Sequence, residues 1–545
     1  MMEEQQKAFA ALLPDLEDDK PHAALLHGVT GSGKTVVFLK LIERTLELGR
    51  RALVLVPEIS LTPQMIRRLK STFGSRLAVQ HSALNNTERL LQWRMIQQGN
   101  ADIVVGTRSA VFSPLHNLGL IIVDEEQEHT YQSESAPRYD AHDIAKKRAV
   151  MENALLVFAS ATPLTETYHA AQSGKLKLVT LTQRYGGNPL PKVQIVDMRA
   201  ELASGNPREI SLAMEDAIRR NLDAGKQTIL LLNRRGYQTM AQCDDCREVL
   251  KCPKCSVPMV YHKAGHKLLC HYCGTQLDPP PKTCPACGGK LLYRGFGTQK
   301  AEEELAELFP EARVLRMDLD TTMSRFAYEE KFGYFAAGKY DIMVGTQMVA
   351  KGLDFPRVGL VGILSADQSL YGDDYRCFET TFSLLTQVIG RAGRRDTSLL
   401  TQVVGRAGRG NKKGRAIVQT YTPENYVIEL ASRQDYPAFY ATEIAARRMM
   451  KYPPYADLCQ FGFVGLKEEE VRAAVGRFLH QLRETVTRQA GRLPVIVLDP
   501  VPASVYRVSG KYRYKLLMKT VNTAALREMI AQLLTDFSRK SENKN

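Results

Sequence analysis

Short segments built around runs of consecutive apolar residues recur along this chain, separated by stretches with helical periodicity. The first group lies at 23–29, 52–58, 101–107, 118–126 and 154–162, and a second group lies at 227–236, 312–318, 340–346 and 358–367. A strand without polar alternation is typical of a parallel sheet covered by helices on both faces. The sequence therefore predicts two α/β domains, each built on a parallel sheet.

Changes in pattern divide the chain further. Residues 182–198 contain a Gly-Gly pair and two prolines, so we place the hinge there and expect a first domain at 1–185 and a second at 186–425. A cysteine-rich block at 240–295 interrupts the second domain as an insertion. Residues 426–545 follow a strand–helix–strand–strand–helix pattern, which predicts a small α+β domain.

The composition excludes several protein classes. With 24% charged and 44% hydrophobic residues, the 545-residue chain has the balance of a globular protein, not of a disordered or fibrous one. It contains no apolar run of about 18 residues, and its acidic start lacks the basic region of a secretory signal. We therefore expect a cytoplasmic protein without membrane contact. The net charge of +14 permits a polyanionic partner but is equally compatible with none.

Residues 28–35, Gly-Val-Thr-Gly-Ser-Gly-Lys-Thr, match the phosphate-loop pattern GxxxxGK[ST]. The glycines let backbone N–H groups surround phosphate oxygens, Lys34 adds charge, and Thr35 offers a hydroxyl to Mg²⁺. An apolar strand precedes the loop and a helix follows it, which argues against an ordinary glycine-rich turn. The predicted ATP-binding residues are Gly28, Gly31, Ser32, Gly33, Lys34 and Thr35.

The apolar run at 118–126 ends in a pair of carboxylates. Asp124 is predicted to hold Mg²⁺ together with Thr35, and Glu125 to orient or deprotonate the attacking water. From the second domain, Arg391 and Arg394 lie three residues apart on one helical face, as expected of arginines that neutralise a phosphoryl transition state. These residues predict a nucleoside-triphosphate hydrolase.

The arginine motif is duplicated. Residues 383–394 recur at 398–409 with 11 of 12 positions identical. In a helix the 15-residue offset spans about 22 Å, so both copies cannot reach one nucleotide. We favour Arg391 and Arg394. Two alternatives remain open: Arg406 and Arg409 serve the site, or the insertion displaces both pairs.

Eight of the ten cysteines form four CxxC pairs, which is typical of structural zinc sites in a chain without a secretory signal. Eight thiolates are sufficient for two Zn²⁺ ions with four ligands each. We expect nested pairing, with Cys252, Cys255, Cys270 and Cys273 on one ion and Cys243, Cys246, Cys284 and Cys287 on the other. The alternative is a set of reduced cysteines without metal.

Several motifs occur in the order found in superfamily-2 helicases: GVTGSGKT, VPEISLTPQM, GTRSAVFSPL, DEEQEH, SATP, LLNRRGY, GTQMVAKGLDFP and QVIGRAGR. Because the cysteine block lies between LLNRRGY and GTQMVAKG, the chain more closely resembles the PriA family of bacterial primosomal replication-restart helicases. The resemblance implies two RecA-like domains, the same zinc pairing, and ATP-dependent 3′→5′ helicase activity in replication restart and primosome assembly at stalled forks.

The resemblance also implies partners and residue roles. The partners would be single-stranded and forked DNA, other primosome proteins and single-strand-binding protein, with the chain acting as a monomer. Asp354 would contact the nucleotide, Gln5 or Gln6 would read the adenine, and Ser160 and Thr162 would couple hydrolysis to motion. The implied DNA contacts are Thr107, Arg108, Tyr131, Arg138, Tyr139, Thr346 and Gln347. Aromatic and basic side chains suit strand binding without sequence preference, although packing explains any single one equally well.

The chain also departs from the family pattern. It begins almost at the phosphate loop, so we expect the family's N-terminal DNA-binding region to be missing. Gln127 replaces a usual His, and because an amide can still bridge to the other domain we expect altered coupling and not its loss. Asp140 and His142 replace a usual His and Arg, which removes a positive charge and adds a negative one near the proposed DNA-sensing residues. Two rival functions follow: a zinc-bearing DNA- and protein-binding scaffold with an impaired motor, and a translocase that acts on RNA or on protein–DNA complexes.

Overall fold

The computed structural model describes residues 1–57, 69–82, 84–184, 190–232, 238–243, 245, 250–254, 259–262, 267–270, 275–296, 298–317, 325–346, 349, 355, 357–370, 374–392, 414–488 and 494–539. The chain forms two compact units. Unit 1 comprises Met1–Arg235, Ala301–Gly372 and Arg376–Tyr440, and unit 2 comprises Gly236–Lys300, Asp373–Tyr375 and Ala441–Asn545.

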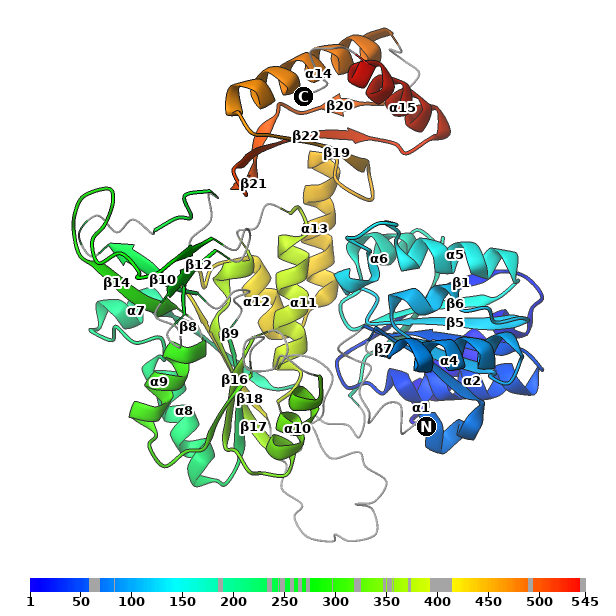
Figure 1. Ribbon diagram of the computed structural model, residues 1–545. Helices are drawn as coiled ribbons and strands as arrows, with labels where there is room; N and C mark the ends of the chain where they lie inside the picture. The colour runs from blue at the N-terminus through cyan, green and yellow to red at the C-terminus, as the bar shows by residue number, and fades with distance from the viewer. Residues whose placement is uncertain are drawn as a thin grey trace. The chain divides into compact units, whose positions relative to one another are not determined.

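The first domain of unit 1 is built on a seven-stranded parallel sheet of order β3-β4-β2-β5-β6-β1-β7. Its strands are β1 (His22–Gly28), β2 (Arg51–Leu55), β3 (Leu77–Gln80), β4 (Ile103–Gly106), β5 (Leu118–Asp124), β6 (Leu155–Ser160) and β7 (Lys177–Leu181). Helices α1 (Glu3–Glu17) and α2 (Lys34–Glu47) lie on one side, and α5 (Ala141–Met151) and α6 (Thr165–Gln172) lie on the other (Figure 1). The helix α4 (Asn86–Gln97) completes this domain.

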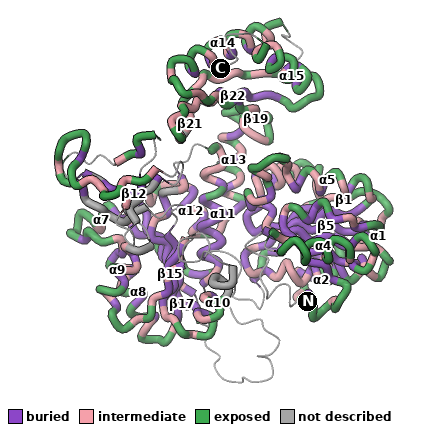
Figure 2. Tube along the Cα trace, in the orientation of Figure 1, coloured by how far each residue is buried: buried purple, intermediate pink, exposed green. Residues whose placement is uncertain are grey.

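Strand β1 shows why these segments are apolar throughout. Leu25 and Leu26 are both fully buried, but they belong to separate hydrophobic clusters on opposite faces of the sheet. Burying one such side chain stabilises the fold by about 1.5–3 kcal/mol. The strands accordingly form the buried centre of the domain (Figure 2).

The second domain of unit 1 contains a six-stranded parallel sheet of order β15-β16-β9-β17-β18-β8. The strands are β8 (Lys192–Asp197), β9 (Gln227–Leu232), β15 (Val314–Met317), β16 (Ile342–Gly345), β17 (Val358–Ser365) and β18 (Arg415–Thr420). Helices α8 (Leu212–Asp223) and α9 (Thr298–Leu308) cover one face, and α10 (Arg325–Ala336), α11 (Cys377–Ile389) and α12 (Tyr426–Arg433) cover the other (Figure 1). A short helix, α7 (Met198–Ala203), follows β8. The prediction of two parallel-sheet domains is confirmed.

Unit 1 ends later than the boundary at 426 that the sequence predicts. It extends to Tyr440, within α13 (Tyr436–Met450). The physical reason is that Val427, Ile428 and Ala431 of α12 are fully buried in the core of unit 1.

Unit 2 contains two antiparallel sheets. In the cysteine-rich block, β10 (Gln238–Cys243), β11 (Val260–His262), β12 (Lys267–Leu269), β13 (Gln276–Leu277) and β14 (Leu291–Phe296) pair in the order β13-β12-β11-β10-β14. In the C-terminal part, β22 (Lys511–Thr520) pairs with β19 (Asp457–Gly465), β20 (Ile496–Val497) and β21 (Val501–Val508).

The C-terminal sheet is covered by α14 (Glu468–Arg488) and α15 (Ala524–Arg539). Phe461, Leu516 and Met518 from the sheet pack with Phe478 and Leu533 from these helices. The predicted small α+β domain is therefore confirmed. Among the described residues, no helix is long and apolar enough to cross a membrane.

Candidate nucleotide, nucleic-acid and metal sites

The phosphate loop joins β1 to α2 at the carboxyl edge of the first sheet. Gly31 and Gly33 have φ of 81° and 80°, a left-handed conformation that favours glycine. Lys34 Nζ donates to the carbonyl of Gly28 at 2.9 Å, so the ammonium lies over the loop. The Ser32 hydroxyl is buried without a hydrogen-bond partner among the described residues. A buried hydroxyl without a partner fits a loop that receives a phosphate.

Gln5, rather than Gln6, lies against this loop. Its side chain is fully buried, and its Nε2 donates to the carbonyl of Ser32 at 2.9 Å. Its Oε1 accepts a hydrogen bond from the backbone N–H of Met2 at 3.0 Å. Gln5 therefore fixes the start of α1 to the phosphate loop.

The two acids follow directly at the end of β5. The Glu125 N–H donates to Asp124 Oδ1 at 3.0 Å, and Glu125 has a left-handed φ of 47°. Burial and the neighbouring Glu125 carboxylate raise the pKa of Asp124 to about 7, although Lys34 opposes this shift. A buried carboxylate of this kind is stabilised by a cation. The oxygens of Asp124 and Thr35 are of the type that Mg²⁺ prefers, so the residues fit the ion.

The Glu125 carboxylate receives hydrogen bonds from both domains of unit 1. Gln127 Nε2 donates to Glu125 Oε2 at 2.7 Å, and Gln387 Nε2 of α11 donates to the same oxygen at 3.2 Å. The Gln127 oxygen accepts from the Ser160 hydroxyl, which in turn accepts from the Thr162 N–H at 2.8 Å. Gln127 thus connects the segment after β5 to Ser160 at the end of β6 within the first domain. Gln387 of the second domain donates the other hydrogen bond to Glu125.

Three polar residues of α11 face the first domain. The Glu379 carboxylate accepts from the Thr165 N–H at 2.5 Å, and the Ser383 and Thr162 hydroxyls lie 2.8 Å apart. Together with Gln387, these residues are spaced four apart, so they share one helix face. Sequence reasoning missed Glu379 and Ser383, but this polar stripe on an apolar helix is a signal that identifies them.

The nucleotide contacts predicted in the second domain are only partly described. Arg391 lies just beyond α11 and is half-buried, and its N–H donates to the carbonyl of Val388 at 3.0 Å. Arg394, Asp354, Arg406 and Arg409 lie outside the described residues. The choice between the two arginine pairs therefore stays a prediction.

Among the predicted DNA-binding residues, Arg108 and Tyr139 lie together. Arg108 Nη1 donates to the carbonyls of Thr130 at 3.1 Å and Gln132 at 2.5 Å, and its guanidinium carbon lies 5.8 Å from the centre of the Tyr139 ring. Tyr139 packs edge-on against Phe112, which is 48% exposed, at 4.9 Å between ring centroids. A basic side chain and two aromatic rings therefore form a group that is partly exposed at the surface.

Tyr131 differs from this group. It is only 1% exposed, and its hydroxyl donates to the carbonyl of Asp124 at 2.6 Å. In this structure its ring belongs to the core and supports the strand that carries the acids, so it is not placed to stack on a base.

The remaining predicted DNA contacts are spread over unit 1. Thr107 is buried at the end of β4, and Arg138 is exposed and donates from Nε to the carbonyl of Glu134 at 3.2 Å. Thr346 follows β16, and Gln347 lies outside the described residues. Asp140 accepts from the N–H of His142 at 2.8 Å and caps α5.

Three of the predicted zinc ligands are close together in unit 2. Cys243, Cys284 and Cys287 have sulfur atoms within 4.8 Å of one another, and the Cys243 and Cys287 sulfurs lie 3.4 Å apart. Thiolates at this spacing fit a structural zinc ion. Cys252 and Cys270 are buried, whereas Cys246, Cys255 and Cys273 lie outside the described residues.

We expect the chain to bind two Zn²⁺ ions, and Cys284→Ser to reduce this number to one. Losing one of four thiolates weakens a site whose folding depends on the metal. Zinc content after dialysis, measured by atomic absorption, tests this expectation. The control is Cys459→Ser in β19, far along the sequence from the CxxC pairs, which should keep both ions. If Cys284→Ser also keeps both ions, Cys284 is not a required zinc ligand.

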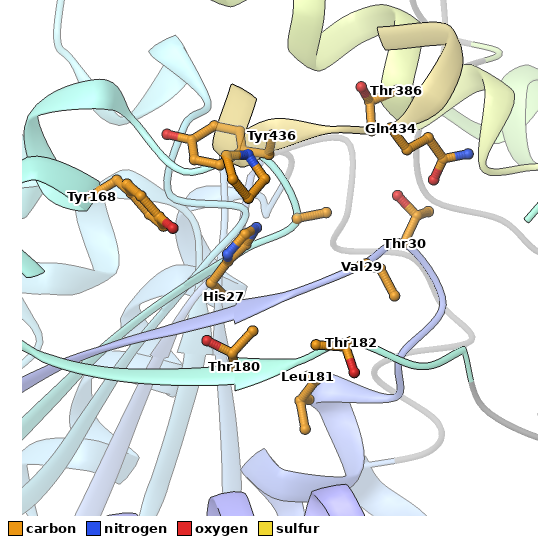
Figure 3. A pocket seen from close by; sticks show the side chains of 12 residues that line it. His27, Val29, Thr30, Tyr168, Thr180, Leu181, Thr182, Thr386, Gln434 and Tyr436 are labelled. Carbon is orange, nitrogen blue, oxygen red and sulfur yellow. The ribbon is translucent and has the colours of Figure 1, made fainter. Parts of the chain in front are cut away.

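His27, at the end of β1, is 8% exposed and packs edge-on against Tyr168 and Tyr436 at 5.5 and 5.1 Å between ring centroids (Figure 3). Burial, followed by the charge of Lys34, lowers the pKa of His27 to about 4. The imidazole is therefore neutral near pH 7.

The depressed pKa of His27 predicts acid-sensitive stability. An unfolded histidine binds its proton near pH 6.5 and the folded one near 4, so the stability present above pH 6.5 is lost as the pH falls through this window. We expect wild type to lose on the order of 2 kcal/mol more than His27→Gln between pH 7 and 5, measured by urea unfolding. His480→Gln, which alters an exposed histidine, is the control. Equal losses in wild type and His27→Gln would contradict the expectation.

The fold and the site together define a class of protein. A phosphate loop and two acids in one parallel-sheet domain, with Gln387 of a second such domain bonded to Glu125, are the parts of a two-domain helicase. The chain matches the DEAD/DEAH box helicase family over residues 2–170 and the helicase conserved C-terminal domain over 288–411. It also matches the PriA DNA helicase Cys-rich region over 252–276 and the primosomal protein N C-terminal domain over 448–545.

Curated relatives identify the family. The chain is 43% identical to the replication restart protein PriA of Bacillus subtilis, over 100% of this chain and 65% of that protein. It is 38% identical to the same protein of Chlamydia trachomatis, over 98% of this chain and 68% of that protein. The chain belongs to the PriA family of replication restart proteins, and it spans less than two thirds of the Bacillus relative. A structure of RecG bound to a three-way DNA junction aligns with a TM-score of 0.44 at 18% identity, over 83% of this chain and 50% of RecG.

Proposed function

We propose that this chain is an ATP-dependent DNA helicase that couples hydrolysis to 3′→5′ movement along single-stranded DNA during replication restart. The observation that carries the proposal is the pair of hydrogen bonds to Glu125 from Gln127 and Gln387. The residue proposed to activate water is thus oriented by both domains of unit 1. A motor requires such a link, because its catalytic acid must respond to domain movement.

The geometry supports a role in hydrolysis for each of these residues. Lys34 and the backbone of the phosphate loop would bind the triphosphate of ATP. Thr35 and Asp124 would hold Mg²⁺, and the ion would supply positive charge against the phosphates. Glu125 accepts a proton from the water that attacks the γ-phosphorus, and the products are ADP and phosphate. Arg391, with Arg394, adds positive charge from the second domain.

A short series of hydrogen bonds links the proposed DNA-contacting residue Arg108 to Asp124. Arg108 holds the carbonyls of Thr130 and Gln132, which flank Tyr131, and Tyr131 donates to the carbonyl of Asp124. A DNA strand bound at Arg108 and Tyr139 would act on Asp124 through these contacts. The further proposed DNA contacts are Thr107, Arg138, Thr346 and Gln347. Backbone phosphates and base stacking would give salt-sensitive binding without sequence preference.

Family membership supports the remaining assignments. We propose two structural Zn²⁺ ions in the cysteine-rich block, a cytoplasmic monomer, and forked DNA, primosome proteins and single-strand-binding protein as partners. Forked DNA is the substrate at which a replication restart protein acts.

The test is ATP turnover with and without single-stranded DNA, followed by unwinding of forked duplexes with a 3′ or a 5′ single-stranded arm. We expect DNA to raise turnover and unwinding to require the 3′ arm. If DNA binds and zinc is retained but turnover does not rise, the chain is a scaffold with an impaired motor. If single-stranded RNA stimulates turnover equally well, the assignment to DNA is wrong.

A further inference from the structure

A buried arginine connects the two domains of unit 1 beside the phosphate loop. Arg184 is 5% exposed and follows β7 in the hinge segment predicted at 182–198. Its Nε donates to the carbonyl of Thr30 in the phosphate loop at 3.1 Å, and its Nη2 donates to the carbonyl of Gly390 at the end of α11. One side chain thus binds backbone atoms of both domains. A buried guanidinium requires such acceptors, and its rigid fork fixes the distance between them.

The two segments that Arg184 binds are in close contact. A Cβ atom on Gly390 would lie 2.5 Å from Thr30 Cγ2, so only glycine permits this approach. Arg391, the proposed nucleotide contact, is the next residue. The hydrogen bonds of Arg184 therefore tie the residue before Arg391 to the phosphate loop.

A cavity beside this contact leaves space in which the side chains can move. Its volume is about 180 Å³, and it is lined by residues of the first domain and by Thr386 and Gln434 of the second (Figure 3). The hydroxyls of Thr30 and Thr386 and both polar atoms of the Gln434 amide are buried without a hydrogen-bond partner among the described residues. Buried groups without partners weaken a contact, so this one can rearrange more readily than a packed core.

We propose that Arg184 is a positioning residue that holds the phosphate loop and the Gly390–Arg391 turn in the arrangement needed for DNA-stimulated turnover. This inference rests on the proposed function. Arg184 acts through the backbone carbonyls of Thr30 and Gly390, to which its guanidinium donates. Its loss should therefore lower the catalytic rate more than the affinity for nucleotide.

The experiment compares Arg184→Ala and Arg184→Lys with wild type. A lysine keeps the charge but lacks the fork that spans two carbonyls. We expect Arg184→Ala to lower DNA-stimulated kcat about tenfold or more while KM for ATP changes less than about threefold, with Arg184→Lys in between. The matched control is Arg50→Ala. Arg50 donates to the carbonyls of Leu118, Glu152 and Asn153 inside the first domain only. Its loss should leave the ratio of stimulated to basal turnover unchanged.

Hydrogen–deuterium exchange separates failure of this inference from failure of the proposed function. Arg184→Ala should raise exchange in peptides covering 28–36 and 386–392 together, even if wild type shows no DNA stimulation. A wild-type chain without stimulation counts against the proposed function alone. Unchanged exchange in either peptide would overturn the role of Arg184. Where DNA does stimulate wild type, a DNA-stimulated kcat of Arg184→Ala within twofold of wild type, or an equal loss of kcat in Arg50→Ala, would overturn it as well.

Discussion

Replacing Lys34 with alanine should lower ATP turnover by about 100-fold or more. The Lys34 ammonium lies over the phosphate loop, where its Nζ donates to the Gly28 carbonyl at 2.9 Å. A triphosphate in the loop would take this charge, and a neutral methyl group cannot replace it. Steady-state turnover with saturating single-stranded DNA, together with titration of a fluorescent ADP, measures both catalysis and binding. We expect both to weaken.

Lys40→Ala is the control for this change. Lys40 lies on the same helix but is exposed and pairs with Glu43, so its loss should leave turnover within about twofold of wild type. If Lys34→Ala kept full turnover, the phosphate loop would not be the catalytic site.

Glu125→Gln should lower kcat by about 1,000-fold while leaving nucleotide affinity nearly unchanged. The amide oxygen can still accept the hydrogen bonds that Gln127 and Gln387 donate, but the amide cannot take a proton from water. The substitution therefore isolates the proton transfer from the contact between domains. Single-turnover hydrolysis and fluorescent ADP binding together measure this separation.

Glu152→Gln is the matched control. Glu152 lies at the end of α5 and pairs with Arg148 at 3.5 Å, away from the carboxyl edge of the sheet. Its turnover should equal that of wild type. Turnover within tenfold of wild type in Glu125→Gln would show that another group activates the water.

The fold was predictable from the sequence because a strand that is buried on both faces of a sheet is apolar at consecutive positions. Every position of β1 from Ala24 to Leu26 is fully buried, and such runs are distinctive. The boundary at 426 could not be placed in the same way, because the buried face of α12 has the same composition whether it packs on unit 1 or on another domain.

The site was predictable where chemistry demands particular residues at fixed spacing, as in the phosphate loop and the pair of Asp124 and Glu125. Tyr131 shows that the sequence does not reveal which hydrogen bond a side chain makes in the folded chain. An aromatic residue near a DNA-contacting motif is compatible with stacking, but its hydroxyl reaches the Asp124 carbonyl only in the folded chain. Arg184 is a similar case, because backbone carbonyl acceptors have no sequence signature.

The pairing of β10 with β14 has a consequence for how the zinc block could have entered this family. Gln238 lies directly opposite Phe296, so the block begins and ends at neighbouring positions on adjacent strands. Neighbouring strands are separated by about 5 Å, a gap that a short turn can close. These two strands carry the chain into and out of the block, and within unit 2 the Gly510 N–H also donates to the Lys254 carbonyl of the block at 2.7 Å. Evolution can therefore lengthen, shorten or replace the block without changing the strand order of the second parallel sheet.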